Sequence, residues 1–169
     1  MRRALLWTAI VVGALLLQST VFAKIELLGA KPELMYLLTV LTALLEGPAS
    51  GAAVGFAGGM AEDFLLPHVP KGITALTLTL LGYTVGMVRQ YIVSPSALVP
   101  VIMVAGGTAL GLLFNGLVKF LLGQLHPGWL FQLRIAVLDG LYNAILTPFV
   151  FPLVRRVAES SRAKRVFRW

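Results

Sequence analysis

The chain has no cysteine among its 169 residues, and this absence excludes several kinds of chemistry. Disulfides, thiolate metal sites and cysteine nucleophiles all require that side chain. Histidine is also scarce, because only His68 and His126 are present. Charged residues make up 12% of the chain, which is about half the share in an ordinary soluble domain. We therefore expect no metal, no cofactor and no large polar surface.

Hydrophobic residues make up 58% of the chain and gather into six apolar stretches. A helix that crosses a bilayer needs roughly 20 residues, and the second stretch is the shortest. The sequence predicts an all-α integral membrane protein, with a single domain of six transmembrane helices at 1–154 and a basic cytoplasmic tail at 155–169. The first stretch is interpreted as a retained signal anchor. The stretches are 4–23, 33–45, 48–66, 72–88, 97–122 and 129–154.

The weak second stretch leaves alternatives open. It could begin before Pro32, or it could be a short buried helix instead of a span. Four spans with a re-entrant pair would also fit. Basic residues favour six spans, because one side then carries nine of them against three, and an excess of Lys and Arg marks the cytoplasmic side. The nine are Arg2, Arg3, Arg89, Arg155, Arg156, Arg162, Lys164, Arg165 and Arg168, and the three are Lys24, Lys31 and Lys71. Both termini are therefore expected in the cytoplasm.

Glycine recurs at every fourth position of the third stretch. This spacing places the residues along one slowly rotating face of a helix. Small residues on such a face let another helix approach closely in a membrane. We expect a surface for helix packing or for a partner protein, with a second, shorter glycine pair in the fourth stretch. The glycines are Gly47, Gly51, Gly55, Gly59, Gly82 and Gly86.

A few polar residues interrupt the apolar stretches. Asp63 closes the glycine series next to Glu62, and an ion pair of Asp63 with Lys119 or Arg134 is one interpretation. The other is that the bases extend toward water and the acids touch the interface.

Asp139 lies ten residues into the last stretch, about 15 Å along a helix, with Tyr142 and Asn143 on the same face. A carboxyl group near the bilayer centre could bind a proton, an ion or a solute. A hydrogen-bonded carboxyl that holds helices together is the interpretation that we favour. The basic tail is expected to contact anionic lipid, with a cytoplasmic protein as the alternative. Nucleic acid is not expected, because membrane topology already accounts for the charge.

Several segments resemble the rod-shape-determining membrane protein MreD of bacteria. They are LLLQSTVF, KPELMYLLTVLTALLEGPASGAAVGFAGGMAEDFL, KGITALTLTLLGYTVG and YNAILTPFVFPLVRR, which together span most of the chain. The most specific part is the glycine-spaced stretch that ends in Asp63, and the acidic position of the family falls on this residue.

The resemblance implies a fold similar to the six-helix substrate-binding subunits of energy-coupling-factor transporters. It implies a non-enzymatic scaffold of the elongation complex (elongasome), which maintains rod cell shape and directs peptidoglycan synthesis from the inner membrane. Its implied partners are MreC, MreB filaments and the glycosyltransferase–transpeptidase pair. The alternatives are a vitamin- or solute-binding transporter subunit, with an outer pocket near Trp129, Glu62, Asp63, Lys119 and Arg134, and an intramembrane enzyme, for which Asp139 lacks a second catalytic group.

Overall fold

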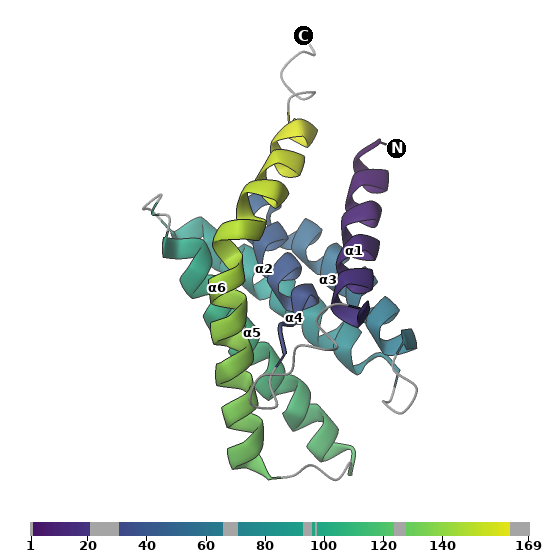
Figure 1. Cartoon of the computed structure of the whole chain (residues 1–169), viewed down its shortest axis with the longest axis vertical. Coiled ribbons are helices and arrows are strands. Elements are labelled where there is room, and N and C mark those ends of the chain that lie inside the picture. The colour runs from purple at the N-terminus through teal and green to yellow at the C-terminus, as the bar shows by residue number, and fades with distance from the viewer. Residues whose placement is uncertain are drawn as a thin grey trace.

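The computed structural model describes residues 2–20, 31–65, 71–92, 96, 98–123 and 128–162. This part of the chain forms six α-helices and one turn of 3-10 helix, without a strand (Figure 1). Lys24, both histidines and the tail beyond residue 162 lie outside the described residues. The elements are α1 (Arg2–Thr20), α2 (Leu34–Glu46), α3 (Pro48–Leu65), α4 (Ile73–Val88), η2 (Arg89–Tyr91), α5 (Leu98–Leu121) and α6 (Trp129–Arg162).

The short helix α2 occupies the centre of the bundle. It contacts all five other α-helices, and its residues from Leu34 to Ala43 are all buried. A helix that is apolar all round is suited to such a position, because every face meets another helix. Its 13 residues correspond to about 20 Å. The stretch that is weakest as a span is therefore the central helix of the bundle.

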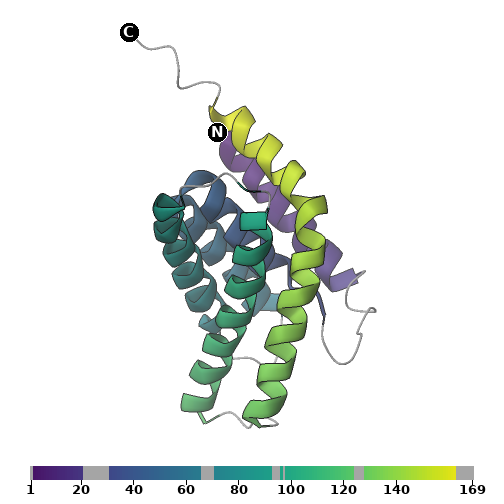
Figure 2. The ribbon, with the colours of Figure 1, turned by 90° about the vertical axis from the view of Figure 1, so that its left-hand side faces the viewer.

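The helices α5 and α6 form a long antiparallel pair that reaches below the rest of the bundle (Figures 1 and 2). We call the end where α1 begins and α6 ends the upper end, and the end where α6 begins the lower end. The carboxylate of Asp139 contacts Lys31, just before α2. Because α6 begins ten residues earlier, at Trp129, it extends about 15 Å below that level.

The last helix also continues further than expected at its upper end. Pro148 and Pro152 lie inside α6, which runs through both to Arg162, eight residues into the predicted tail. It changes direction in its upper half (Figure 2), as proline inside a helix favours. Val154 and Ala158 in this upper part are buried. The boundary at residue 154 is therefore not the end of the packed helical structure.

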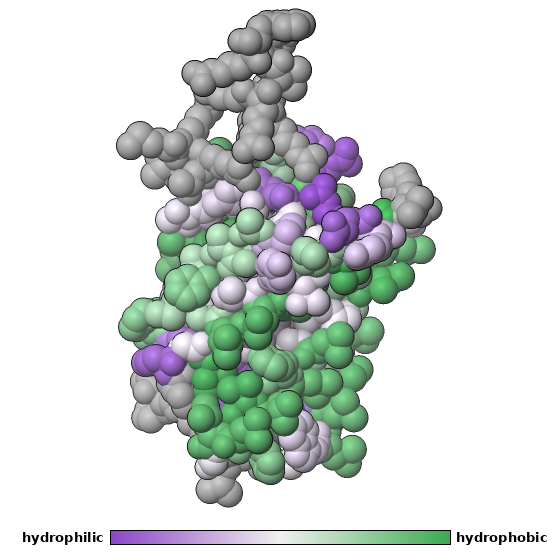
Figure 3. Space-filling model, turned by 180° about the vertical axis from the view of Figure 1, so that it is seen from behind, coloured by the Kyte–Doolittle hydropathy of each residue, from purple (hydrophilic) through white to green (hydrophobic). Residues whose placement is uncertain are grey.

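The surface of the bundle is rich in large apolar side chains. Hydrophobic residues cover most of the lower part of the face in Figure 3, and hydrophilic ones gather toward the upper end. Two helices among the described residues, α5 and α6, are long and apolar enough to cross a membrane. The predicted boundaries of the third, fourth and fifth stretches agree with α3, α4 and α5 to within one residue at each end.

Candidate functional site

The glycine face of α3 packs directly on α4, and these two helices share the most extensive contact of any pair in the described part of the chain. A Cβ atom on Gly51 would lie 2.5 Å from the Cβ of Ala43 in α2, and one on Gly59 would lie 2.5 Å from the Cα of Ala75 in α4. A Cβ on Gly55 would overlap the carbonyl group of Leu78. The series therefore brings backbones together within the chain.

The glycine pair of α4 completes this contact from the other side. A Cβ on Gly82 would collide with the carbonyl group of Gly51, and one on Gly86 would collide with Pro48. Gly47 has a different role, because its φ of 99° lies in the left-handed region and lets the chain turn from α2 into α3. Packing of α3 against α4 thus accounts for five of the six glycines selected from the sequence, and the turn accounts for the sixth.

Asp63 caps the first turn of α4. Its Oδ2 accepts hydrogen bonds from the backbone N–H of Gly72, at 2.9 Å, and of Ala75, at 3.2 Å. Gly72 stands at the N-cap position and has no side chain to supply this acceptor. The carboxylate also lies at the positive end of the helix dipole. Lys71 donates to the backbone carbonyl of Asp63 at 2.5 Å, which closes the turn between the two helices.

The bases that were considered as partners of Asp63 lie elsewhere. In the portion of the chain described, no ion pair joins Asp63 to Lys119 or Arg134. Lys119 is partly buried, and the carboxylates of Glu33, Glu62 and Asp63 lie near enough to favour its positive charge. Arg134 is exposed. Lys119 therefore lies in the region of the two acids, but Asp63 is held by backbone N–H groups.

Glu62 takes part in a second polar contact, which joins three segments. The side-chain amide of Gln18 in α1 donates to Oε2 of Glu33 and to Oε1 of Glu62, at 3.0 Å in both cases. Glu62 is buried and Glu33 is half-buried. This amide links α1 to the start of α2 and to α3 near their lower ends. Gln18 and Glu33 were not among the residues selected from the sequence. A lone amide inside the apolar run LLLQST nevertheless indicates that Gln18 needs a hydrogen-bond partner inside the bundle.

Asp139 and Asn143 hold the backbone that leads into α2. The Oδ1 of Asp139 accepts from the backbone N–H of Lys31 at 2.8 Å, and the Nδ2 of Asn143 donates to the backbone carbonyl of Glu33 at 2.9 Å. The same amide donates to the hydroxyl of Thr108 in α5 at 3.1 Å. Both α6 residues are buried. We call Asp139 and Asn143 the α6 clamp.

The clamp shows where Asp139 lies relative to the other helices. The residue is ten positions from the start of α6, but the level that it reaches is the lower end of α2. The helix pair α5–α6 projects past the other helices, and the sequence could not show this. The structural role favoured for Asp139 agrees with the geometry, because its carboxylate holds another segment of the chain.

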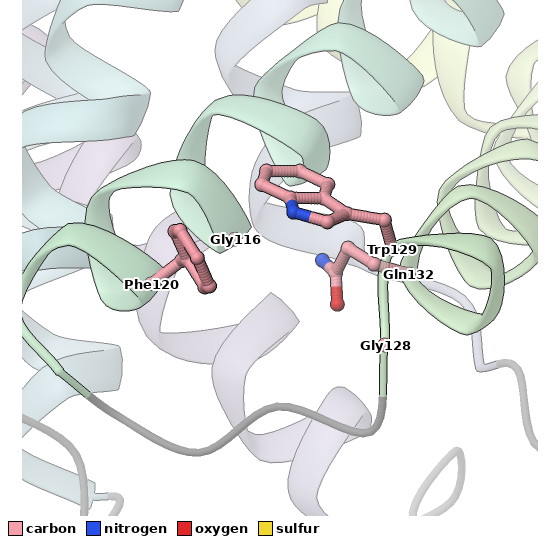
Figure 4. Close-up of a pocket in the computed structure, with 5 residues that line it drawn as sticks. All are labelled: Gly116, Phe120, Gly128, Trp129 and Gln132. Carbon is pink, nitrogen blue, oxygen red and sulfur yellow. The ribbon is translucent and has the colours of Figure 1, made fainter.

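A small cavity lies near the lower tip of the α5–α6 pair (Figure 4). Its volume is about 50 Å³, and Trp129 and Gln132 face Phe120 and Gly116 across it. The rings of Phe120 and Trp129 are 5.7 Å apart at a tilt of 58°. Glu62 and Asp63 do not line this cavity, and Arg134 lines a separate surface hollow. Of the five residues proposed for an outer pocket, Trp129 and Arg134 therefore line different hollows.

The selected polar groups are occupied in holding helices together. The carboxylates of Asp63 and Asp139 accept backbone N–H groups, and the amide of Asn143 joins two segments. Among the residues that the structure describes, no group of three or more His, Asp or Glu is placed to hold a metal ion. The arrangement can therefore bind helices to one another.

Comparison with known proteins was made for the whole chain. The family model described as rod shape-determining protein MreD matches residues 1–157. No curated protein and no solved structure matches the chain. The matched range includes every helix except the last turns of α6, and the apolar surface of that range is typical of a membrane protein. The chain therefore belongs to the MreD family of rod shape-determining proteins.

Proposed function

We propose that the chain is a non-enzymatic scaffold of the bacterial cell-elongation complex, in which it binds an MreC-type protein and helps to direct peptidoglycan synthesis. The observation that carries the proposal is the family match over residues 1–157. The structure supports it, because the buried glycines and the polar groups of the α6 clamp hold helices together. MreB filaments and the glycosyltransferase–transpeptidase pair are further proposed partners.

We also propose that the chain crosses the inner membrane six times, with both termini in the cytoplasm. The upper end carries Arg89, Arg155 and Arg156, as the excess of basic residues on the cytoplasmic side requires. The helices α2 and α4 have 13 and 16 residues, which give about 20 and 24 Å against a hydrocarbon core of about 30 Å. The shortness of α2 is tolerated because this helix is buried among the other helices.

Reporter fusions test this topology. Fusions after residue 89 and at the C-terminus are expected to report cytoplasm, and fusions at residues 71 and 127 are expected to report periplasm. A periplasmic C-terminus would require an odd number of spans and would overturn the proposal.

Affinity purification in mild detergent tests the scaffold function. The expected result is recovery of the MreC protein of the same organism, a single-pass protein with a large periplasmic part. Recovery of a transporter ATPase module in its place would support a solute-binding subunit of similar fold. A solute pocket measures at least about 300 Å³, whereas the cavity at Trp129, where the sequence analysis placed the outer pocket, holds about 50 Å³. A small molecule retained through purification would also support it.

A further inference from the structure

Four buried side-chain oxygens near the lower end of the bundle have no hydrogen-bond donor among the described residues. They belong to Gln18, Glu62, Asp63 and Asn143. The other buried atom without a partner in this part of the chain is a donor, Nε1 of Trp7. It lies eleven residues before Gln18 on α1, about 17 Å along the helix. Buried polar atoms normally have a partner, so the lower end of the bundle is short of donors.

The shortage centres on the carboxyl groups of Glu33 and Glu62. Both accept from Nε2 of Gln18 at 3.0 Å, which places the two accepting oxygens no more than about 6 Å apart. The two carboxyl groups also lie within hydrogen-bonding reach of each other. The side chain of Glu62 is only 9% exposed. Two negative charges held so close together in a buried place disfavour each other.

The charged groups around this pair do not remove the conflict. Asp63 and Asp139 add negative charge, and each is already held by backbone N–H groups. Lys119 lies near both carboxyl groups, but no ion pair joins it to either of them in the described part of the chain. Its ammonium group balances one negative charge and leaves the other. The groups that face the pair are the uncharged Gln18 in α1, Lys31 before α2, Tyr36 in α2, Asp63 in α3, Lys119 in α5 and Asp139 in α6.

A single proton satisfies both the geometry and the charge of the pair. On Oε2 of Glu62 it gives this buried atom an O–H group, which can donate to the carboxylate of Glu33. The remaining negative charge then faces Lys119, and Nε2 of Gln18 still donates to both groups. Adjacent buried carboxyl groups share one proton in this way because both cannot be ionised together.

We infer that Glu33 and Glu62 bind one proton between them, and that this proton keeps α1 attached to α2 and α3. The main contacts of α1 are with these two helices, and the amide of Gln18 joins it to the pair. Without the proton, the two carboxylates repel each other and separate, so that Gln18 no longer donates to both. The attachment of α1 is therefore present at low pH and is lost as the pH rises and the pair gives up its proton. The inference concerns the bundle itself and does not depend on the scaffold function.

Infrared spectroscopy of the purified full-length chain tests for the proton directly. A protonated carboxyl group has a C=O band that is separate from the carboxylate bands and shifts in D₂O. At neutral pH, Glu62→Gln and Glu33→Gln are each expected to lose the intensity of one protonated carboxyl group, because the new amide can donate to the remaining carboxylate. The control is Glu159→Gln, in an exposed ion pair with Arg155, which is expected to leave the band unchanged.

A spin label at the lower end of α1 measures its attachment. The chain has no cysteine, so Ser19→Cys, at an exposed position next to Gln18, introduces a single thiol for the label. In this background the mobility of the label is expected to rise as the pH is raised. Addition of Glu62→Gln, which has no proton to lose at this position, is expected to keep the mobility low at every pH. Addition of Gln18→Leu removes the contact and is expected to give a mobile label throughout.

Other results overturn the inference. If the chain shows no protonated carboxyl band, the pair is ionised. If the band is lost in Asp139→Asn but kept in both glutamine variants, the proton lies elsewhere. Label mobility that is independent of pH, or that changes equally in Glu62→Gln, shows that the proton does not hold α1, and mobility that follows the sodium concentration at constant pH identifies a metal cation in its place. Should Glu62→Gln fail to fold, Glu33→Gln, at a half-buried position, provides the same two measurements.

Discussion

Replacement of Asp63 by alanine is the most direct test of how α3 and α4 are joined. The carboxylate is fully buried and accepts the backbone N–H groups of Gly72 and Ala75. Loss of a helix N-cap costs about 0.5–2 kcal/mol, and a buried N–H left without an acceptor costs about 1–3 kcal/mol. We expect Asp63→Ala to lower the free energy of unfolding by about 2 kcal/mol, which is up to about a 30-fold change in the folding equilibrium.

The matched variant Asp63→Asn keeps the shape and one acceptor oxygen but loses the charge. It is expected to cost about half as much, since hydrogen bonds to charged groups are worth roughly twice those to neutral ones. The control is Glu159→Ala, which breaks an exposed ion pair with Arg155 and is expected to change stability by less than about 1 kcal/mol.

Hydrogen exchange in detergent micelles shows which part of the chain is destabilised by Asp63→Ala. In Asp63→Ala, the amides of the first turn of α4 are expected to exchange faster, while those of α5 keep their protection. Unchanged exchange at Gly72 and Ala75 would refute the capping role. In that case any loss of stability would have to come from the space left by the carboxyl group.

Three further predictions concern the other contacts. Gly59→Ala is expected to cost about 1–3 kcal/mol through overpacking against Ala75, whereas Gly106→Ala, which meets nothing within 4 Å, is expected to be neutral in the same thermal unfolding assay. Asn143→Ala removes hydrogen bonds to Glu33 and Thr108 and is expected to cost about 1–2 kcal/mol; equal protection of the α2 amides in variant and parent would contradict the clamp. Arg134→Ala is expected to be additive with Asp63→Ala in a double-mutant cycle, and a coupling above about 0.5 kcal/mol would show that the two charges interact.

The positions of the helices followed from the sequence because apolar runs and turn residues mark them directly. Gly47–Pro48 separates α2 from α3, and Lys71–Gly72 precedes α4. The glycine spacing of α3 also predicted close packing on one face. The sequence could not show which helix would fill that face, because a partner protein and α4 are equally suited to a smooth surface.

For the polar residues as well, the sequence predicted a need for partners, and only the structure shows which groups these partners are. Composition alone indicated that Asp63, Asp139 and Asn143 would need partners, since an unsatisfied polar group in an apolar environment is costly. Their partners are backbone groups of segments distant in sequence, and hydrogen bonds to backbone leave no pattern in the side chains. The ion pair expected for Asp63 was based on side-chain charges alone.

The sequence by itself determined that this protein is helical, strongly apolar and without the residues of thiol or multi-histidine chemistry, because these properties depend on composition and local periodicity. Only the tertiary structure decided that the short α2 is the central helix and that α5 and α6 extend beyond the others. It also decided that one face of α3 is closed while the opposite face is open. Such properties depend on how helices of unequal length fit around one another, and this fit is set by contacts between residues far apart in the chain.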